Sequence, residues 1–123
     1  MPQSFDRRFR FRIIAGVAMT MLAASVPAQG VSELIVIEDP HCAPCQRFER
    51  QVGTHYPLTD VARSLPIRRL PLDGYEAAGL RVERPIHRAP TFLIVENQVE
   101  QHRFEGYSSD ELFWMTLESL VAR

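Results

Sequence analysis

The sequence predicts a single α/β domain with a central mixed sheet of about four strands, ordered βαβ and then ββα and flanked by helices. Two short, β-branched apolar runs, residues 34–38 and 91–96, are typical of buried strands. A stretch of helical character follows the first run, and a capped amphipathic stretch ends the chain. The length of 123 residues fits one domain.

The first elements are a strand at residues 34–38, a turn at 39–41 and a helix. We expect the helix to begin near Cys42 and to end at Gly53. Pro44 fits its first turn, where a missing N–H is no loss. Phe48 and Val52 share a helix face with Cys45, so this face is expected to be buried.

The chain then continues through a loop, a short helical turn and a second strand. Tyr56 and Pro57 start the loop, and residues 59–63 could form the turn with Thr59 as its cap. Residues 67–72 are the strand candidate, bracketed by Pro66 and Pro71.

The second half is expected to contain a long connection and then a hairpin. Residues 73–89 lack periodicity, so we expect a loop with at most one short helical turn at 75–79. The strong strand 91–96 is followed by Asn97-Gln98, a plausible hairpin turn, and by a more polar, edge-like strand at 99–105.

A C-terminal helix closes the domain after Gly106-Tyr107 breaks the last strand. Ser108 and Glu111 have the spacing of a capping box. One stripe of the helix carries Leu112, Phe113, Thr116, Leu117, Leu120 and Val121.

Residues 1–28 are interpreted as a secretory signal peptide. A basic region with four arginines precedes an apolar stretch at 13–26, and Val26-Pro27-Ala28 supplies small residues for cleavage after Ala28. The apolar stretch is shorter than the roughly 20 residues of a membrane-spanning helix, although a retained N-terminal anchor is the alternative. The mature domain would be residues 29–123, which predicts export to the periplasm.

The charge balance excludes one class of partner. Residues 29–123 keep 10 of the 14 arginines and 14 of the 15 acidic residues, a net charge of −4. This mild acidity lacks the basic face that nucleic-acid binding requires, so no nucleic-acid partner is expected.

The only two cysteines, Cys42 and Cys45, form a C-x-x-C motif at the predicted helix start. A helix N-terminus stabilises a thiolate, which favours Cys42 as the nucleophile and the more buried Cys45 as the resolving thiol. A purely structural bridge is the alternative, but the loop it would close is too short to stabilise the fold much. The motif therefore indicates redox chemistry.

The order of C-x-x-C helix, strand, connection, Ala89-Pro90-Thr91, strand hairpin and helix resembles the thioredoxin fold. Residues 41–48, 56–59 and 65–69, with Gly106-Tyr107 and residues 111–114, resemble the small periplasmic SoxS-type proteins of bacterial sulfur-oxidation operons. The resemblance covers nearly all of residues 29–123. It implies a minimal thioredoxin-like fold with a cis peptide bond between Ala89 and Pro90.

The resemblance also implies a function. Cys42 and Cys45 would be catalytic, exchanging disulfides with a partner protein that carries a disulfide or modified cysteine, such as a sulfur carrier. The substrate-binding residues would be His41, Ala43, Pro44, Ala89, Pro90 and Thr91. Electrons would come from a membrane thiol transporter, and we expect a monomer without a cofactor. Because Pro44 before the second cysteine matches reducing thioredoxins, we expect a reductant.

One departure from the family concerns proton transfer. Thioredoxins have a buried acid in the strand before the motif, and Val36 occupies that position here. Glu38 is the nearest carboxylate on the strand and is expected to be a solvated charge at the strand end. Arg69 falls where thioredoxins have a basic partner, but arginine does not readily release a proton.

Metal- or persulfide-binding is the alternative function, in which the cysteines capture a ligand rather than exchange disulfides. Cys42, Cys45 and His41 would supply three ligands at most, whereas zinc needs about four. Gln46 stands where covalent haem attachment requires histidine. We therefore expect no metal site.

Overall fold

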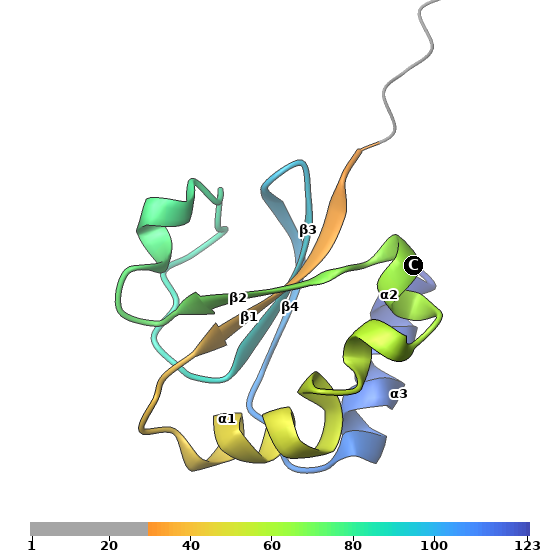
Figure 1. Ribbon diagram of the computed structural model, residues 1–123. Helices are drawn as coiled ribbons and strands as arrows, with labels where there is room; N and C mark the ends of the chain where they lie inside the picture. The colour runs from red at the N-terminus through yellow and green to blue at the C-terminus, as the bar shows by residue number, and fades with distance from the viewer. Residues whose placement is uncertain (1–29) are drawn as a thin grey trace, which may run out of the picture.

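The computed structural model describes residues 30–123, which form a four-stranded sheet with helical segments on both faces (Figure 1). The strands are β1 (Ser32–Glu38), β2 (Ile67–Pro71), β3 (Thr91–Glu96) and β4 (Val99–Glu105), in the spatial order β2-β1-β3-β4. The predicted signal peptide, residues 1–28, lies outside the described residues.

The sheet is mixed, as predicted. Strand β1 pairs with β2 in parallel and with β3 antiparallel, and β3 pairs antiparallel with β4. The two central strands, β1 and β3, are almost fully buried because both of their faces are covered, which explains their continuous apolar runs. The edge strands are more polar.

Six helical segments connect or follow the strands. They are α1 (Ala43–Phe48), η1 (Glu49–Gly53), η2 (Tyr56–Leu58), α2 (Val61–Ser64), η3 (Tyr75–Ala78) and α3 (Asp110–Val121). The helix predicted from Cys42 to Gly53 is confirmed in extent, although its second half, η1, winds as a π-helical turn. None of the helices in this part of the chain is long and apolar enough to cross a membrane.

Both predicted helix caps are wrong by one residue. The hydroxyl of Thr59 donates to the Tyr56 carbonyl at 2.6 Å and so closes η2, while Asp60 occupies the N-cap position of α2. Ser109, not Ser108, caps α3, because its extended backbone lets its hydroxyl accept the Leu112 N–H at 3.2 Å. The threonine and serine residues in the sequence therefore predicted where the two helices begin, but not which residue caps each of them.

The main core lies between the sheet and the helices. Its centre is aromatic: Phe48 of α1 packs against Phe92, Tyr107 and Phe113 at ring-centroid distances of 4.9, 5.5 and 5.3 Å. Two members of the predicted stripe on α3 do not join this core, since Leu112 and Val121 are 52% and 49% exposed. Only the part of α3 that faces the sheet is buried.

The long connection covers the other face of the sheet, and η3 confirms the single helical turn expected within it. Tyr75 and Ile86 pack there against Ile35, Leu93 and other apolar side chains of β1 and β3. The connection leads to Ala89 and Pro90, so it also delivers the second half of the site described below.

Candidate active site

Cys42 and Cys45 form a disulfide at the start of α1. Cys42 is the N-cap residue: its backbone is extended, and its sulfur accepts the Cys45 N–H at 3.1 Å. The same N–H would stabilise a thiolate on Cys42 after reduction, because free N–H groups at a helix start favour negative charge.

The two sulfur-bearing residues differ in exposure. Cys45 is 3% exposed, whereas Cys42 is partly exposed. Cys45 is buried because it shares a helix face with Phe48, one turn inside the helix. A partner molecule therefore reaches Cys42 more easily than Cys45.

The segment from Ala89 to Thr91 lies against Cys42. The Ala89 carbonyl oxygen is 3.3 Å from Cys42 Sγ, and the peptide bond between Ala89 and Pro90 is cis, as the resemblance implied. Thr91 is buried, and its hydroxyl donates to the Arg88 carbonyl at 2.6 Å. Residues 47 positions apart in sequence thus meet at the disulfide.

The other predicted substrate-binding residues surround Cys42 in the chain. His41 and Ala43 are exposed and Pro44 is half-buried. The His41 backbone N–H donates to Asp39 Oδ1 at 2.9 Å, which fixes the turn before the helix, while the imidazole faces solvent. These residues form an accessible rim beside the disulfide.

Glu38 is not the solvated strand-end charge that we expected. Leu34, Val36 and Glu38 lie on the same side of β1, because side chains alternate along a strand, and this side faces α1. The Glu38 side chain is only 26% exposed. Among residues 30–123, its Oε1 atom is buried and has no hydrogen-bond donor.

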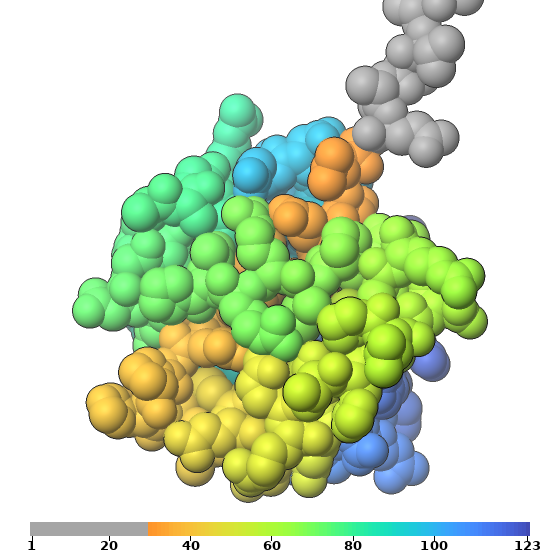
Figure 2. Space-filling view, in the orientation of Figure 1, coloured from red at the N-terminus to blue at the C-terminus, as the bar shows by residue number. Residues whose placement is uncertain are grey.

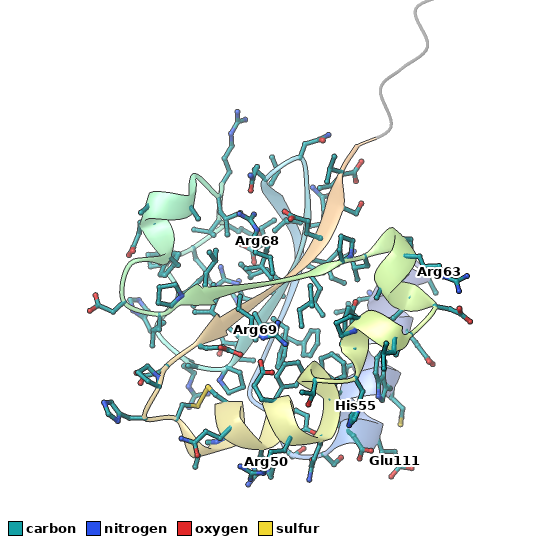
Figure 3. All side chains as sticks on the ribbon, in the orientation of Figure 1. Arg50, His55, Arg63, Arg68, Arg69 and Glu111 are labelled. Carbon is teal, nitrogen blue, oxygen red and sulfur yellow. A yellow bond between two sulfur atoms is a disulfide. The ribbon has the colours of Figure 1, made fainter. Side chains whose placement is uncertain are left out.

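Glu38 faces a second carboxylate, Glu49, and both lie beside Arg69. Arg69 donates to Glu49 from Nε and from a terminal nitrogen at 2.5 and 3.0 Å, but its Nε is 3.7 Å from Glu38 Oε1. Arg69 is on β2 opposite Val36, and Figure 3 shows it on the side of β2 that is turned toward α1. The two carboxylates therefore share one guanidinium, and Glu49 holds it more closely.

This arrangement moves the two pKa values apart. The pKa of Glu38 is raised to about 7, chiefly by burial and then by the neighbouring Glu49, whose effect is larger than the lowering by Arg69. Burial is also the strongest single effect on Glu49 and raises its pKa, but the hydrogen bonds from Arg69, the contact with Glu38 and the charge of Arg69 together outweigh it and lower the pKa of Glu49. Two neighbouring carboxyl groups rarely ionise together, so the pKa of one rises while the other stays charged.

Gly53 makes room for the ion pair. Arg69 donates to the Gly53 carbonyl at 3.1 Å, and a Cβ atom at this position would collide with the Glu49 carboxylate. The absence of a side chain at the end of η1 thus lets Arg69 approach the helix.

A pocket of about 390 Å³ joins these carboxylates to the buried cysteine. Its lining includes Glu38, Glu49 and Arg69 together with Cys45. Figure 2 shows the orange and yellow surface of β1 and α1 meeting the green surface of β2 where these segments adjoin. The acidic pair is therefore connected to the Cys45 side of the disulfide.

Glu49 is the residue of this cluster that sequence reasoning missed. A signal was present, because Glu49 follows Cys45 by four residues and so shares its helix face. Glu38 carried a comparable signal, since it follows Val36 by two residues on an otherwise apolar strand face.

Glu38→Gln is expected to stabilise the oxidised protein at pH 8 and to change its stability little at pH 5. The folded state favours the protonated form of a carboxyl whose pKa is raised on folding. Below its ordinary pKa of 4.5 the carboxyl therefore costs no stability, and the cost grows as the pH rises to about 7. We expect a gain of about 1–2 kcal/mol at pH 8, less than a fully buried carboxyl would give. Urea unfolding at both pH values measures it.

Glu33→Gln is the matched control for this prediction. Glu33 is on the same strand, its side chain is 23% exposed, and it pairs with Arg68 at 3.0 Å on another part of the sheet. Its substitution should change stability by a similar amount at both pH values. Equal effects of Glu38→Gln at pH 5 and pH 8 would contradict the raised pKa.

No group of three or more His, Cys, Asp or Glu side chains that could hold a metal ion occurs within residues 30–123. Cys42 and Cys45, the residues that the alternative metal- or persulfide-binding function would use, are joined to each other, and His41 is exposed beside them.

Comparison with known proteins identifies structural relatives. The sequence matches no family model and no curated protein sequence. The structure is similar to the reduced periplasmic thioredoxin SoxS from Paracoccus pantotrophus, with a TM-score of 0.70 and 35% identity over 74% of this chain and 96% of that chain. The similarity therefore extends over almost the whole of SoxS.

More distant thioredoxins share the fold. The Malassezia sympodialis thioredoxin has a TM-score of 0.55 and 16% identity, over 73% of this chain and 78% of that chain. The Fasciola hepatica thioredoxin has a TM-score of 0.53 and 19% identity, over 73% and 82%.

Proposed function

This chain belongs to the thioredoxin-like superfamily and is a thiol-disulfide oxidoreductase, and we propose that it works in the periplasm as a reductant of a partner protein. The observation that carries the proposal is the disulfide itself. Cys42 is partly exposed beside the Ala89 carbonyl, and Cys45 is buried behind it. This is the asymmetry that two successive exchange steps need.

In the first step, the Cys42 thiolate attacks a disulfide of the partner. A mixed disulfide forms between Cys42 and the partner, and the other partner sulfur leaves as a thiolate. The helix-start N–H of Cys45, which lies 3.1 Å from Cys42 Sγ, supports the negative charge on Cys42 before the attack.

In the second step, Cys45 attacks Cys42 Sγ and releases the partner as a thiol. The disulfide between Cys42 and Cys45 that results is the bond present in the structure. Two electrons have then passed to the partner, so the protein must be reduced again. We propose that a membrane thiol transporter supplies these electrons and that the protein acts as a monomer.

The partner is proposed to bind across the rim of the disulfide. Ala89 offers backbone groups for strand-like pairing next to Cys42, and Pro90 and Thr91 hold that segment in place. On the opposite side, His41, Ala43 and Pro44 present the accessible start of the helix.

Export is supported by the similarity to SoxS, which is a periplasmic thioredoxin, and the nature of the partner by the resemblance of the sequence to the SoxS-type proteins of sulfur-oxidation operons. We propose that residues 1–28 direct export and are cleaved after Ala28. The partner is proposed to be a sulfur-carrier protein of sulfur oxidation, whose reactive cysteine becomes blocked as a disulfide or a modified thiol and needs reduction.

Trapping in the native cell tests the proposal. The full chain with Cys45→Ser is produced there, free thiols are alkylated, and covalent adducts are separated without reductant and identified by mass spectrometry. We expect adducts with a periplasmic carrier protein that bears a reactive cysteine. The double variant with Cys42→Ser should give no adducts.

Two results would overturn parts of this proposal. Adducts formed only with cytoplasmic proteins would refute periplasmic action. Periplasmic adducts that lack any sulfur-carrier protein would refute the proposed partner while leaving the oxidoreductase activity intact.

A further inference from the structure

The resolving step requires a base that the sequence did not reveal. Cys45 is 3% exposed, and burial in apolar surroundings favours the neutral thiol. Yet only the thiolate attacks a mixed disulfide. Val36, the strand residue nearest in register to Arg69, has no titratable group and is fully buried.

The pocket beside Cys45 contains three carboxylates that could accept its proton. Asp39 is engaged with the His41 N–H at 2.9 Å, and Glu49 accepts two hydrogen bonds from Arg69. Glu38 has a buried oxygen without a donor. A proton placed between Glu38 and Glu49 would satisfy that oxygen.

We propose that Glu38, paired with Glu49 and held beside Arg69, accepts the proton of Cys45 through water in the pocket that they share. The assignment rests on the proposed role of Cys45 as the resolving thiol. Glu38 receives the proton, Glu49 shares it, and Arg69 keeps the second carboxylate charged. The pocket volume of about 390 Å³ leaves room for water, and Glu38 and Glu49 in its lining offer hydrogen-bond partners to a water that bridges the groups.

The resolving step transfers one proton and exchanges one disulfide bond for another. The Cys45 S–H bond breaks and its proton goes to the carboxylate pair. The Cys45 thiolate forms a bond to Cys42 Sγ, and the bond between Cys42 and the partner sulfur breaks. The electron pair of that bond leaves with the partner thiolate, which takes up a proton from the pair or from solvent.

Glu38→Gln tests the assignment in a reaction that separates the two steps. The reduced protein is mixed with one equivalent of the aromatic disulfide DTNB, which releases one coloured thiolate when Cys42 attacks and another when Cys45 resolves the adduct. Glu38→Gln should leave the first phase unchanged and slow the second at least tenfold at pH 7.5, because a general base commonly contributes about a hundredfold or more.

The pH profile distinguishes proton transfer from a structural effect. Glu38 faces Glu49 of η1 and Arg69 of β2, and Asp39 lines the same pocket. In the wild type the second phase should accelerate as pH rises through about 7, as Glu38 becomes able to accept a proton. In Glu38→Gln it should accelerate only at higher pH, above the ordinary thiol pKa of about 8.5, because burial of Cys45 favours its neutral form.

Two further variants complete the test. Glu49→Gln should also slow the second phase and shift its pH profile, whereas Glu33→Gln, a carboxyl of similar exposure outside the pocket, should behave as the wild type. An unchanged rate of the first phase also shows that Cys42 keeps its native surroundings in each variant. A second phase with normal rate and pH profile in both Glu38→Gln and Glu49→Gln would overturn the assignment.

This outcome is distinct from failure of the proposed function. If the wild type released no coloured thiolate, or if Cys42→Ser released it as fast as the wild type, Cys42 would not be the nucleophile. The assignment of the base fails only when the first phase is present and the second is insensitive to both carboxylates.

Discussion

Cys42→Ser is expected to reduce disulfide reduction to the rate of buffer, whereas Cys45→Ser is expected to stop after the first step with the partner still attached. A serine hydroxyl does not ionise near neutral pH and cannot replace a thiolate as the attacking group. Cys45 is too buried to take over, at 3% exposure. Activity is measured as thiol-dependent reduction of a protein disulfide, and the adduct by mass spectrometry.

Alkylation provides the control for this experiment. In the reduced wild type, iodoacetamide should modify Cys42 at a pH well below the ordinary thiol pKa of about 8.5, because the Cys45 N–H stabilises its thiolate. Cys42→Ser should show only slow modification at Cys45. If wild type, Cys42→Ser and Cys45→Ser reduced disulfides at the same rate, the cysteines would not be the reactive groups.

Sequence patterns correctly predicted the strands, helix start and turn whose structure depends mainly on neighbouring residues. The apolar runs of β1 and β3 identified central strands because both faces of these strands are buried. The C-x-x-C motif with Pro44 identified the helix start and the difference between the two cysteines. Asn97 and Gln98 turn between β3 and β4 with positive φ angles of 51° and 68°, as a tight hairpin requires.

The patterns failed where the outcome depends on contacts between distant segments. Glu38 looked like a strand-end charge because its sequence neighbours include Asp39 and Pro40. Only the packing of α1 and β2 shows that Glu49 and Arg69 enclose it. The exposure of Leu112 has the same origin, since helical spacing alone does not tell where the sheet stops covering α3.

The π-helical turn η1 is another feature that the sequence did not predict. The sequence from Cys42 to Gly53 is typical of an ordinary α-helix, in which each N–H bonds to the carbonyl four residues earlier. In the structure, however, the Thr54 N–H donates to the Glu49 carbonyl, five residues earlier, at 3.1 Å. The turn places Gly53 against Arg69, whose guanidinium donates to the Gly53 carbonyl. Wider turns of this kind often occur at functional sites, and this one lies beside the carboxylate pair.

Phe48→Ala is expected to produce the largest loss of stability, about 3–5 kcal/mol. Phe48 is fully buried, and its ring contacts Phe92, Tyr107 and Phe113. A domain of this size is stable by roughly 5–15 kcal/mol, so the loss is a large share of the total. Urea unfolding of the oxidised protein should show a lower midpoint with an unchanged slope.

Leu112→Ala is the matched control, because Leu112 is a large apolar side chain that is 52% exposed. Its substitution should change stability by about 0.5 kcal/mol or less. If Phe48→Ala does not fold, Phe48→Leu replaces it, with a smaller loss expected from the same cavity argument. Equal effects at positions 48 and 112 would contradict the aromatic core described above.

Phe48 also connects stability to the site, since it lies one turn beyond Cys45 on the same helix face. A cavity at Phe48 removes the contacts that hold α1 against the sheet, and α1 carries both cysteines and leads into Glu49. We therefore expect Phe48→Ala to slow the resolving step more than the first attack, because Cys42 at the helix cap is held also by its neighbour Ala89. The two-phase reaction with DTNB measures this difference directly, and equal slowing of both phases would show that α1 moves as a unit.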